Sequence, residues 1–321
     1  MSRRTLRPVF KRLWLLAPVA TLGVGCSSTW GCDSDENWEQ QTFHVPSTLS
    51  DGRVPTQDTS CVELCEALGA TVPCARIPGS EVGEDGKLIE LVECNAQFAC
   101  EGRRPEGLCT DGAVAPGTPT LGALFAKMAH LEAASVPAFE RLADELSAHG
   151  APEHLVRAAR RSAKDEVRHA SAMESLARRH GAPMPELTVA PFQHRSLEAL
   201  AIENAVEGCV RETFGALLAG WQARSAEDAQ VRESLGAIAP DELMHAELSW
   251  AIDAWAMERL SPEARERVDS ARREAWRQLE QDAAASRLPD EVARHSGLPS
   301  ADMARKLVRE LASELMPGAL A

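Results

Sequence analysis

The sequence predicts a mainly α-helical protein: a four-helix bundle with one long crossover, preceded by a small disulfide-rich domain and followed by extra helices. Three observations support this fold class. From residue 120 onward, Ala, Leu, Glu and Arg recur at helical spacing. Most of the 9 cysteines fall between residues 61 and 109. The phrase Asp-Glu-x-x-His-Ala occurs twice, beginning at Asp165 and at Asp241.

Residues 1–25 have the pattern of a signal peptide, with a basic start and a short apolar run from Leu13 to Gly25. The basic residues are Arg3, Arg4, Arg7, Lys11 and Arg12. The run that ends at Cys26 resembles a bacterial lipobox, although Gly23 replaces the usual larger aliphatic residue. We therefore expect an exported lipoprotein, attached to the membrane of the cell envelope through a lipid on Cys26. A periplasmic or secreted protein is the alternative, and a twin-arginine-like phrase at residues 2–6 leaves the export route open.

Residues 26–60 are polar, and we expect a tether with little regular structure. Residues 61–112 form the predicted Cys-rich domain, with a strand at about 87–94. In an exported chain its cysteines predict a disulfide framework. The candidates are Cys61, Cys65, Cys74, Cys94, Cys100 and Cys109. Their pairing, and the partner of Cys32, stay open. A zinc site is less favoured because no His lies among these cysteines.

The bundle is predicted over residues 120–260. Helices are expected at about 120–148, 152–180, 196–224 and 225–260, with Gly150 and Gly181 ending the first two. The segment 182–195 contains three prolines and reaches about 46 Å when extended, against about 42 Å for a helix of the predicted length. It can therefore run the whole length of the bundle. Charged and amphipathic helices at about 261–285 and 300–315 follow within the C-terminal region 261–321.

Two sets of potential metal ligands follow from the repeat. In Glu-x-x-His the carboxylate and the imidazole lie on one helix face, and a further glutamate precedes each copy at a matching interval. A four-helix bundle can hold two metal ions with two such sets. The candidate ligands are Glu132, Glu166, His169, Glu207, Glu242 and His245.

Several neighbouring side chains compete with these ligands. Glu203, one helical turn before Glu207, is the main rival on its helix. Glu212 and Glu247 each lie five residues beyond a candidate ligand, which turns them partly away in an α-helix. Cys209 is expected in the core, about 200° around the helix from Glu207. His130 is left out for the same reason with respect to Glu132.

The chain from about 120 to 260 resembles the ferritin-like superfamily, which includes rubrerythrins, bacterioferritins and the ferritin-like tRNA hydroxylase. The Cys-rich lead and the Gly-Arg-Arg-Pro-Glu-Gly-Leu linker at 102–108 resemble a less characterised group of exported bacterial ferritin-like proteins. The resemblance implies a centre of two iron ions, with manganese as the alternative. It also implies that Glu166 and Glu242 bridge the two ions and that each His binds one.

The function expected from these features is a di-iron oxidoreductase that uses oxygen or peroxide and takes electrons from an unknown donor. The alternative is a non-enzymatic metal-binding or scaffold lipoprotein with an empty or degenerate site. The chain contains no Tyr, which excludes tyrosyl-radical chemistry. Its formal net charge of −14 disfavours nucleic acid as a partner. Catalytic residues, substrate and oligomeric state are not indicated by the sequence.

Overall fold

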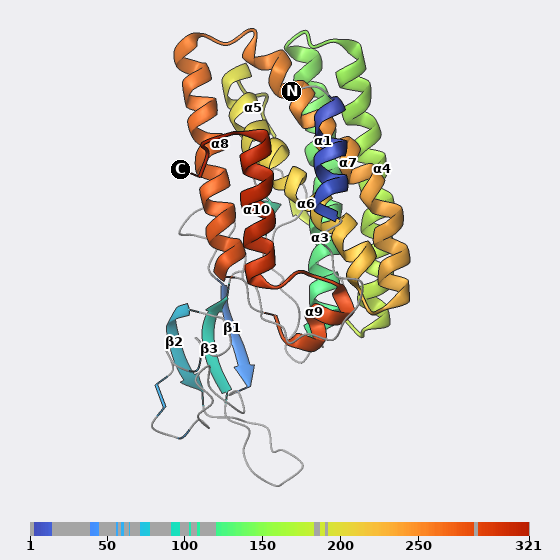
Figure 1. Cartoon of the computed structure of the whole chain (residues 1–321), viewed down its shortest axis with the longest axis vertical. Coiled ribbons are helices and arrows are strands. Elements are labelled where there is room, and N and C mark those ends of the chain that lie inside the picture. The colour runs from blue at the N-terminus through green and yellow to red at the C-terminus, as the bar shows by residue number, and fades with distance from the viewer. Residues whose placement is uncertain are drawn as a thin grey trace.

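In a computed structural model the chain is mainly α-helical, as predicted (Figure 1). The structure describes residues 3–14, 39–44, 56, 59–60, 64, 71–77, 91–96, 103, 108–109, 120–182, 187–189, 192–285 and 288–320. Cys26, Cys32, Cys61, Cys65 and Cys100 lie outside the described residues, and so does most of the predicted tether. Within the described residues, no helix is both long and apolar enough to cross a membrane.

Helices α3 (Thr120–Ala148) and α4 (Glu153–Arg179) form an antiparallel hairpin. Gly150 makes the tight turn between them with a φ of 69°, a conformation that glycine adopts without strain. At the other end of the hairpin, a Cβ on Gly122 would lie 2.7 Å from the carbonyl oxygen of His180. The start of α3 therefore lies directly against the end of α4. Both helices match the predicted bounds closely.

The predicted helix at 196–224 is a continuous rod of three parts: α5 (Leu197–Glu203), the π-helix η1 (Asn204–Glu212) and α6 (Thr213–Ser225). The side chain of Ser196 caps its start by accepting a hydrogen bond from the backbone N–H of Ala199. Helix α7 (Ala229–Met257) is capped by Asp228 and packs along α6 and η1. It also contacts α4, so the two pairs of helices face each other.

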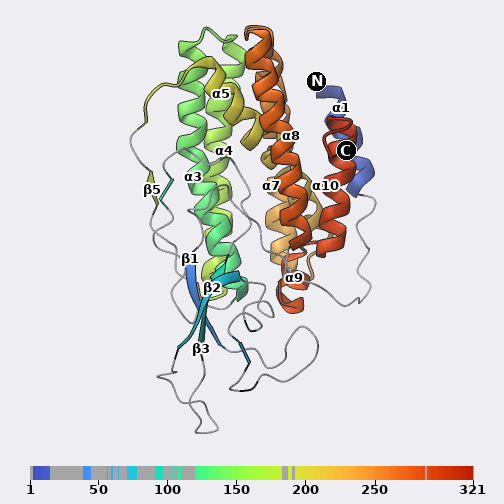
Figure 2. The ribbon, with the colours of Figure 1, turned by 90° about the vertical axis from the view of Figure 1, so that its left-hand side faces the viewer.

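The segment between α4 and α5 crosses from one end of the helices to the other. Arg195, just before α5, donates from its backbone N–H and its side chain to the carboxylate of Glu145 near the end of α3. Because α3 and α4 are antiparallel, α5 begins at the end opposite to the one where α4 stops. Along this segment, β5 (Thr188–Val189) pairs with β4 (Leu108–Cys109) on the outside of the helices (Figure 2). The long crossover is therefore present.

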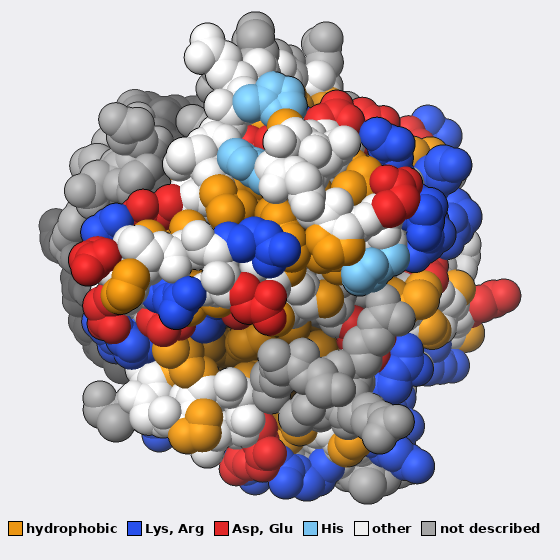
Figure 3. Space-filling model, turned by 90° about the horizontal axis from the view of Figure 1, so that it is seen from above, with side chains coloured by type: hydrophobic (Ala, Val, Ile, Leu, Met, Phe, Trp, Pro, Cys, Tyr) orange, Lys and Arg blue, Asp and Glu red, His pale blue; other side chains and the backbone are white. Residues whose placement is uncertain are grey.

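Three further helices follow: α8 (Pro262–Ala285), α9 (Asp290–Ser296) and α10 (Ala301–Leu315). Together, helices α3 to α10 form the helical body. The predicted C-terminal helices cover the other helices, because α8 packs on η1 and α5 and then pairs with α10. Trp276 and Leu307 lie fully buried in this layer. The short α9 was not predicted. Seen from above, acidic, basic and hydrophobic side chains are mixed on this end of the molecule (Figure 3).

Residues 3–14, which fall within the predicted signal peptide, form helix α1 (Arg3–Trp14) on the surface of α6, α7 and α10 (Figures 1 and 2). Its apolar face, which includes Phe10 and Leu13, is buried in the core. Arg7 forms an ion pair with the buried Glu247, with Nε 2.7 Å from Oε1. The indole N–H of Trp14 donates to the carbonyl of Leu217 at 3.1 Å. Removal of the signal peptide stays a prediction.

A small antiparallel sheet lies at one end of the helical body (Figure 1). Its strand order is β1-β3-β2, with β1 (Glu39–His44), β2 (Thr71–Ile77) and β3 (Leu91–Ala96). Strand β3 overlaps the predicted strand at 87–94. Strand β1 lies in the segment that we expected to lack regular structure. It forms there because pairing with β3 supplies its backbone hydrogen bonds. The backbones of Cys74 and Cys94 are paired in register, and the disulfide framework stays a prediction.

Candidate metal centre

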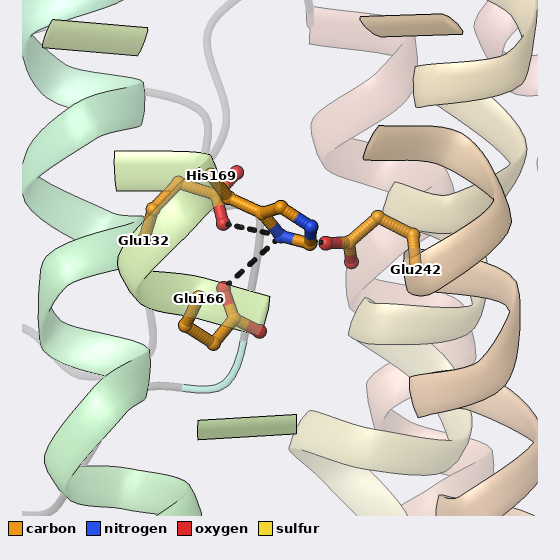
Figure 4. A group of neighbouring side chains, drawn as sticks. All are labelled: Glu132, Glu166, His169 and Glu242. Carbon is orange, nitrogen blue, oxygen red and sulfur yellow. Dashed lines mark ion pairs between the residues drawn. The ribbon is translucent and has the colours of Figure 1, made fainter. Parts of the chain in front are cut away.

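The two copies of Asp-Glu-x-x-His lie on α4 and α7, where these helices face each other. Glu166 and His169 from α4 and Glu242 from α7 meet Glu132 from α3 (Figure 4). All of these side chains are buried, with His245 at 0% and Glu166 at 1% exposure. The structure thus contains a buried cluster of Glu and His residues that could hold a metal ion.

The cluster consists of two groups whose potential ligand atoms lie within 4.8 Å of one another. The first group contains Glu132, Glu166, His169 and Glu242. In it, Nδ1 of His169 lies 2.9 Å from Oε1 of Glu242, 3.5 Å from Oε2 of Glu166 and 3.6 Å from Oε2 of Glu132. Three helices therefore direct oxygen atoms at one imidazole nitrogen.

The second group contains Glu166, Glu212 and His245, so Glu166 belongs to both. Oε1 of Glu166 lies 3.1 Å from Nδ1 of His245, whereas its Oε2 faces His169. Glu242 also lies near both imidazoles, with its Oε1 3.8 Å from Nδ1 of His245. This geometry fits the bridging positions that the resemblance implies for Glu166 and Glu242.

Several atoms that face the cluster are buried and, beyond their contacts with one another, have no hydrogen-bond partner among the described residues. They are both carboxylate oxygens of Glu166, Oε1 of Glu242, Oε1 of Glu212, and the Nδ1 atoms of His169 and His245. Buried polar atoms normally find a hydrogen-bond partner, and leaving one unsatisfied costs about 1–3 kcal/mol. A concentration of such atoms at one place fits the binding of a cation.

Two aspartates, one from each repeat, hold the outer nitrogens of the imidazoles. Nε2 of His169 lies 3.4 Å from Oδ2 of Asp241, and Nε2 of His245 lies 3.4 Å from Oδ2 of Asp165. The exposed Arg168 contacts both aspartates, at 2.8 and 2.9 Å. An aspartate on the outer nitrogen fixes the ring orientation and leaves Nδ1 free to face the cluster. The sequence repeat contained these aspartates, but they were not singled out as site residues.

Burial and mutual contact shift the pKa values of the cluster. Burial, together with the nearby charge of Glu166, raises the pKa of Glu132 well above its usual range. Burial lowers the pKa of His169, but the contacts with Glu132, Glu166 and Glu242 outweigh it and raise that pKa overall. Burial also raises the pKa of Glu212 to about 8, against the opposing effect of Arg103. Without a metal ion, Glu132 and Glu212 therefore retain protons that ordinary carboxylates release, whereas contacts with the two imidazoles lower the pKa of Glu166.

The structure places Glu207 outside both groups and Glu212 inside one of them. Both residues lie on η1, where Glu207 approaches Nε of Arg211 at 3.6 Å. In an α-helix a residue five positions on is turned away by about 140°, which is why Glu212 was a weak candidate. A π-helix bonds residue i to i+5, so this rotation does not apply within η1. Glu212 is a candidate site residue that α-helical spacing does not identify.

The remaining rivals lie elsewhere. Glu203 contacts Arg103 at 3.4 Å and belongs to neither group. Glu247 pairs with Arg7 from α1. Cys209 is a buried free thiol, and His130 is buried away from the ligand atoms of both groups.

The donors present fit a metal cation. Carboxylate oxygens mixed with imidazole nitrogens are donors that divalent metals accept, and a cation would neutralise carboxylates that otherwise repel one another. The two groups share Glu166. No family model, curated protein or solved structure matches this chain.

Proposed function

We propose that the chain is a ferritin-like protein in which α3, α4, α5–η1–α6 and α7 form a four-helix bundle around a dinuclear centre of iron, or alternatively manganese. The proposed ligands are Glu132, Glu166, His169, Glu212, Glu242 and His245. Glu212 takes the position that sequence spacing assigned to Glu207. The observation that carries the proposal is the convergence of buried oxygen and nitrogen atoms without hydrogen-bond partners from α4, η1 and α7.

The charge balance supports two ions rather than none. The ligand set contains four glutamates, all at most 9% exposed. Buried carboxylates at this separation cannot all ionise unless positive charge compensates them. Two divalent cations would balance four carboxylates, and both imidazoles could then remain neutral ligands. One ion would lie with His169 and the other with His245, on either side of Glu166.

We propose that the bound pair serves an oxidoreductase reaction with oxygen or peroxide, because such ions combine redox change with open coordination positions. The protein's part is to fix the ligands. Asp241 and Asp165 hold the outer nitrogens of the imidazoles, and the ring of Phe139 lies 5.0 Å from that of His245 and shields it. Electrons would come from a donor outside the chain.

Metal content tests the proposal, and the chain provides a matched pair of variants. Full-length protein is loaded anaerobically with Fe(II), freed of excess metal and measured by mass spectrometry. We expect close to two ions per chain in the wild type and none in Glu166→Ala. Glu212→Ala should lose one ion, whereas Glu207→Ala, on the same π-helix, should keep both. A wild type without metal would overturn the proposal and leave a helical scaffold.

Oxygen consumption separates an enzyme from a metal-binding protein. The loaded wild type is mixed with oxygen and a chemical electron donor, and uptake is followed beyond one turnover per centre. Continued uptake, absent in Glu166→Ala, supports the oxidoreductase. Two bound ions without sustained uptake would support a metal-binding protein and reject the enzyme.

The cellular setting is a separate proposal. The basic and apolar residues of 1–25 and the motif at Cys26 favour export and lipid attachment. In that case α1 covers the surface of α6, α7 and α10 only in the precursor. The mass of the protein isolated from cell membranes tests this. A lipidated chain that begins at Cys26 supports export, and a chain that retains residues 3–14 makes α1 a permanent part of the fold.

A further inference from the structure

Arg103, in the linker that leads from the Cys-rich region to the helical body, lies inside the helical body. Its side chain is 1% exposed, which is rare for arginine. Nη2 donates to Oδ1 of Asn204 at 2.6 Å, and Nη1 lies 3.4 Å from Oε2 of Glu203. Its backbone carbonyl accepts a hydrogen bond from Ser135 of α3 at 3.0 Å. The linker is thus fixed to both α3 and the α5–η1 segment.

The surroundings of the guanidinium are shaped to receive it. Gly208 of η1 has no side chain at the point of closest approach. A Cβ there would lie 2.5 Å from Oγ of Ser249, and closer still to Nη2 of Arg103. On another side the guanidinium carbon lies 5.6 Å from the ring centre of Phe139, close enough for a cation–π contact. That same ring packs against His245.

Arg103 also faces the metal centre through Glu212. Its Nε lies 3.9 Å from Oε2 of Glu212, and the hydroxyl of Ser249 donates to the same oxygen at 2.9 Å. The other oxygen, Oε1, forms no hydrogen bond and belongs to the group with Glu166 and His245. One oxygen of Glu212 is therefore held from behind, which directs the second one at the cluster.

We propose that Arg103 is a positioning residue for the metal position at Glu212 and His245, so that the linker is a component of the metal centre. This inference rests on the proposed function. Arg103 would support only the position at Glu212 and His245, because no contact joins it to Glu132, His169 or Glu242 in the described structure. Loss of Arg103 should therefore affect one position and spare the other.

The chemistry of the arginine side chain sets the expected size of the effect. Residues that hold a metal ligand from behind typically change metal affinity by 10–100-fold when they are replaced. Arg103→Met removes the charge but fills the space, and it should lower the affinity for one ion by more than about tenfold. Arg103→Lys keeps the charge, but a single ammonium cannot reach Asn204, Glu203 and Glu212 together. It should give a smaller loss at the same position.

The experiment uses full-length protein titrated anaerobically with Mn(II), with bound metal counted and followed by electron paramagnetic resonance. An exchange-coupled manganese pair and an isolated ion give different spectra, so the readout does not depend on activity. The control is Arg272→Met. Arg272 is also buried and ion-paired, to Asp253, but contacts no residue of either metal group in the described structure. It reports the effect of losing a buried ion pair alone.

We expect two ions and a coupled signal in the wild type and in Arg272→Met, and one ion with an isolated signal in Arg103→Met. Two tightly bound ions with an unchanged coupled signal in Arg103→Met would overturn the inference while leaving the proposed function intact. A wild type that binds no manganese would instead overturn the proposed function. If Arg103→Met does not fold, Arg103→Lys decides, and wild-type affinity for both ions in that variant rejects the inference.

Discussion

Replacing Gly208 by alanine tests how closely the linker arginine packs on η1. Inside a helix this exchange normally stabilises a protein, by up to about 1 kcal/mol, because glycine loses more backbone entropy on folding. Here the added Cβ would lie 2.5 Å from Oγ and 2.7 Å from Cβ of Ser249, and closer still to Nη2 of Arg103. The Cβ of Ser249 is fixed to the backbone of α7 and cannot rotate away, so the collision forces a displacement.

The expected penalty follows from the contacts that are displaced. Moving Arg103 breaks its contacts with Asn204 and Glu203 inside the protein. Breaking a buried ion pair typically costs about 3–5 kcal/mol. Subtracting the usual helix gain of about 1 kcal/mol leaves a net loss of roughly 2–4 kcal/mol in the free energy of unfolding.

Urea denaturation of the full chain, followed by circular dichroism, measures the change. Gly236→Ala is the matched control because Gly236 is also helical, on α7, but the nearest atom to an added Cβ is 4.0 Å away. We expect Gly236→Ala to be neutral or stabilising and Gly208→Ala to be destabilising. Equal stabilisation by both substitutions would refute the close packing of Arg103 against Gly208.

Three further predictions concern the imidazoles, pH and α1. Asp241→Asn should weaken metal binding by about 10–100-fold, because it alters the hydrogen bond that orients His169. Calorimetric titration with Mn(II) measures the affinity, and an unchanged value would contradict the orienting role of Asp241. In the metal-free protein, the pKa of Glu212 is raised from 4.5 to about 8, so the folded state keeps a proton that the unfolded chain releases, and stability should fall as pH rises through this window. Thermal unfolding between pH 5 and 8 checks this, and an equally steep fall in Glu212→Gln would show that another group is responsible. Gly220→Ala should release α1 in the full chain, because the added Cβ would lie 2.6 Å from Nε1 of Trp14 and closer to other atoms of that ring. We expect faster proteolysis within residues 3–14, and unchanged protection would contradict the contact.

The sequence was sufficient to predict most of the helical body. The bounds of α3 and α4 follow from helical periodicity and from Gly150 and Gly181, both of which have positive φ values. The long crossover followed from chain length and proline content alone. These features are local, so a single sequence contains the information they need.

Within the site, the residues of the repeat were identified because Glu-x-x-His has a fixed geometry on an α-helix. Glu166, His169, Glu242 and His245 meet as that geometry requires. Glu212 was undervalued because no sequence pattern signals the π-helix, which changes the direction of every side chain after its start. Asp165 and Asp241 each directly precede the Glu of a repeat. This regular position could have indicated that both aspartates belong to the site.

Arg103 could not have been assigned from sequence. It lies in a linker, where arginine is normally exposed, and its side-chain hydrogen bond to Asn204 joins residues 101 positions apart in the chain. The only local hint was Gly208, a glycine within a predicted helix, which often marks a close approach of another segment. Helix α1 was missed for a similar reason, because its amphipathic pattern coincides with that of a leader peptide.

The central claim is that two metal ions bind on either side of Glu166. Crystals of the full-length protein grown with Mn(II), measured at a wavelength where manganese scatters anomalously, test it directly. We expect two anomalous peaks, one among Glu132, His169 and Glu242 and the other beside Glu212 and His245. No peak in the cluster, or a single peak that leaves Glu212 without contact, would contradict it.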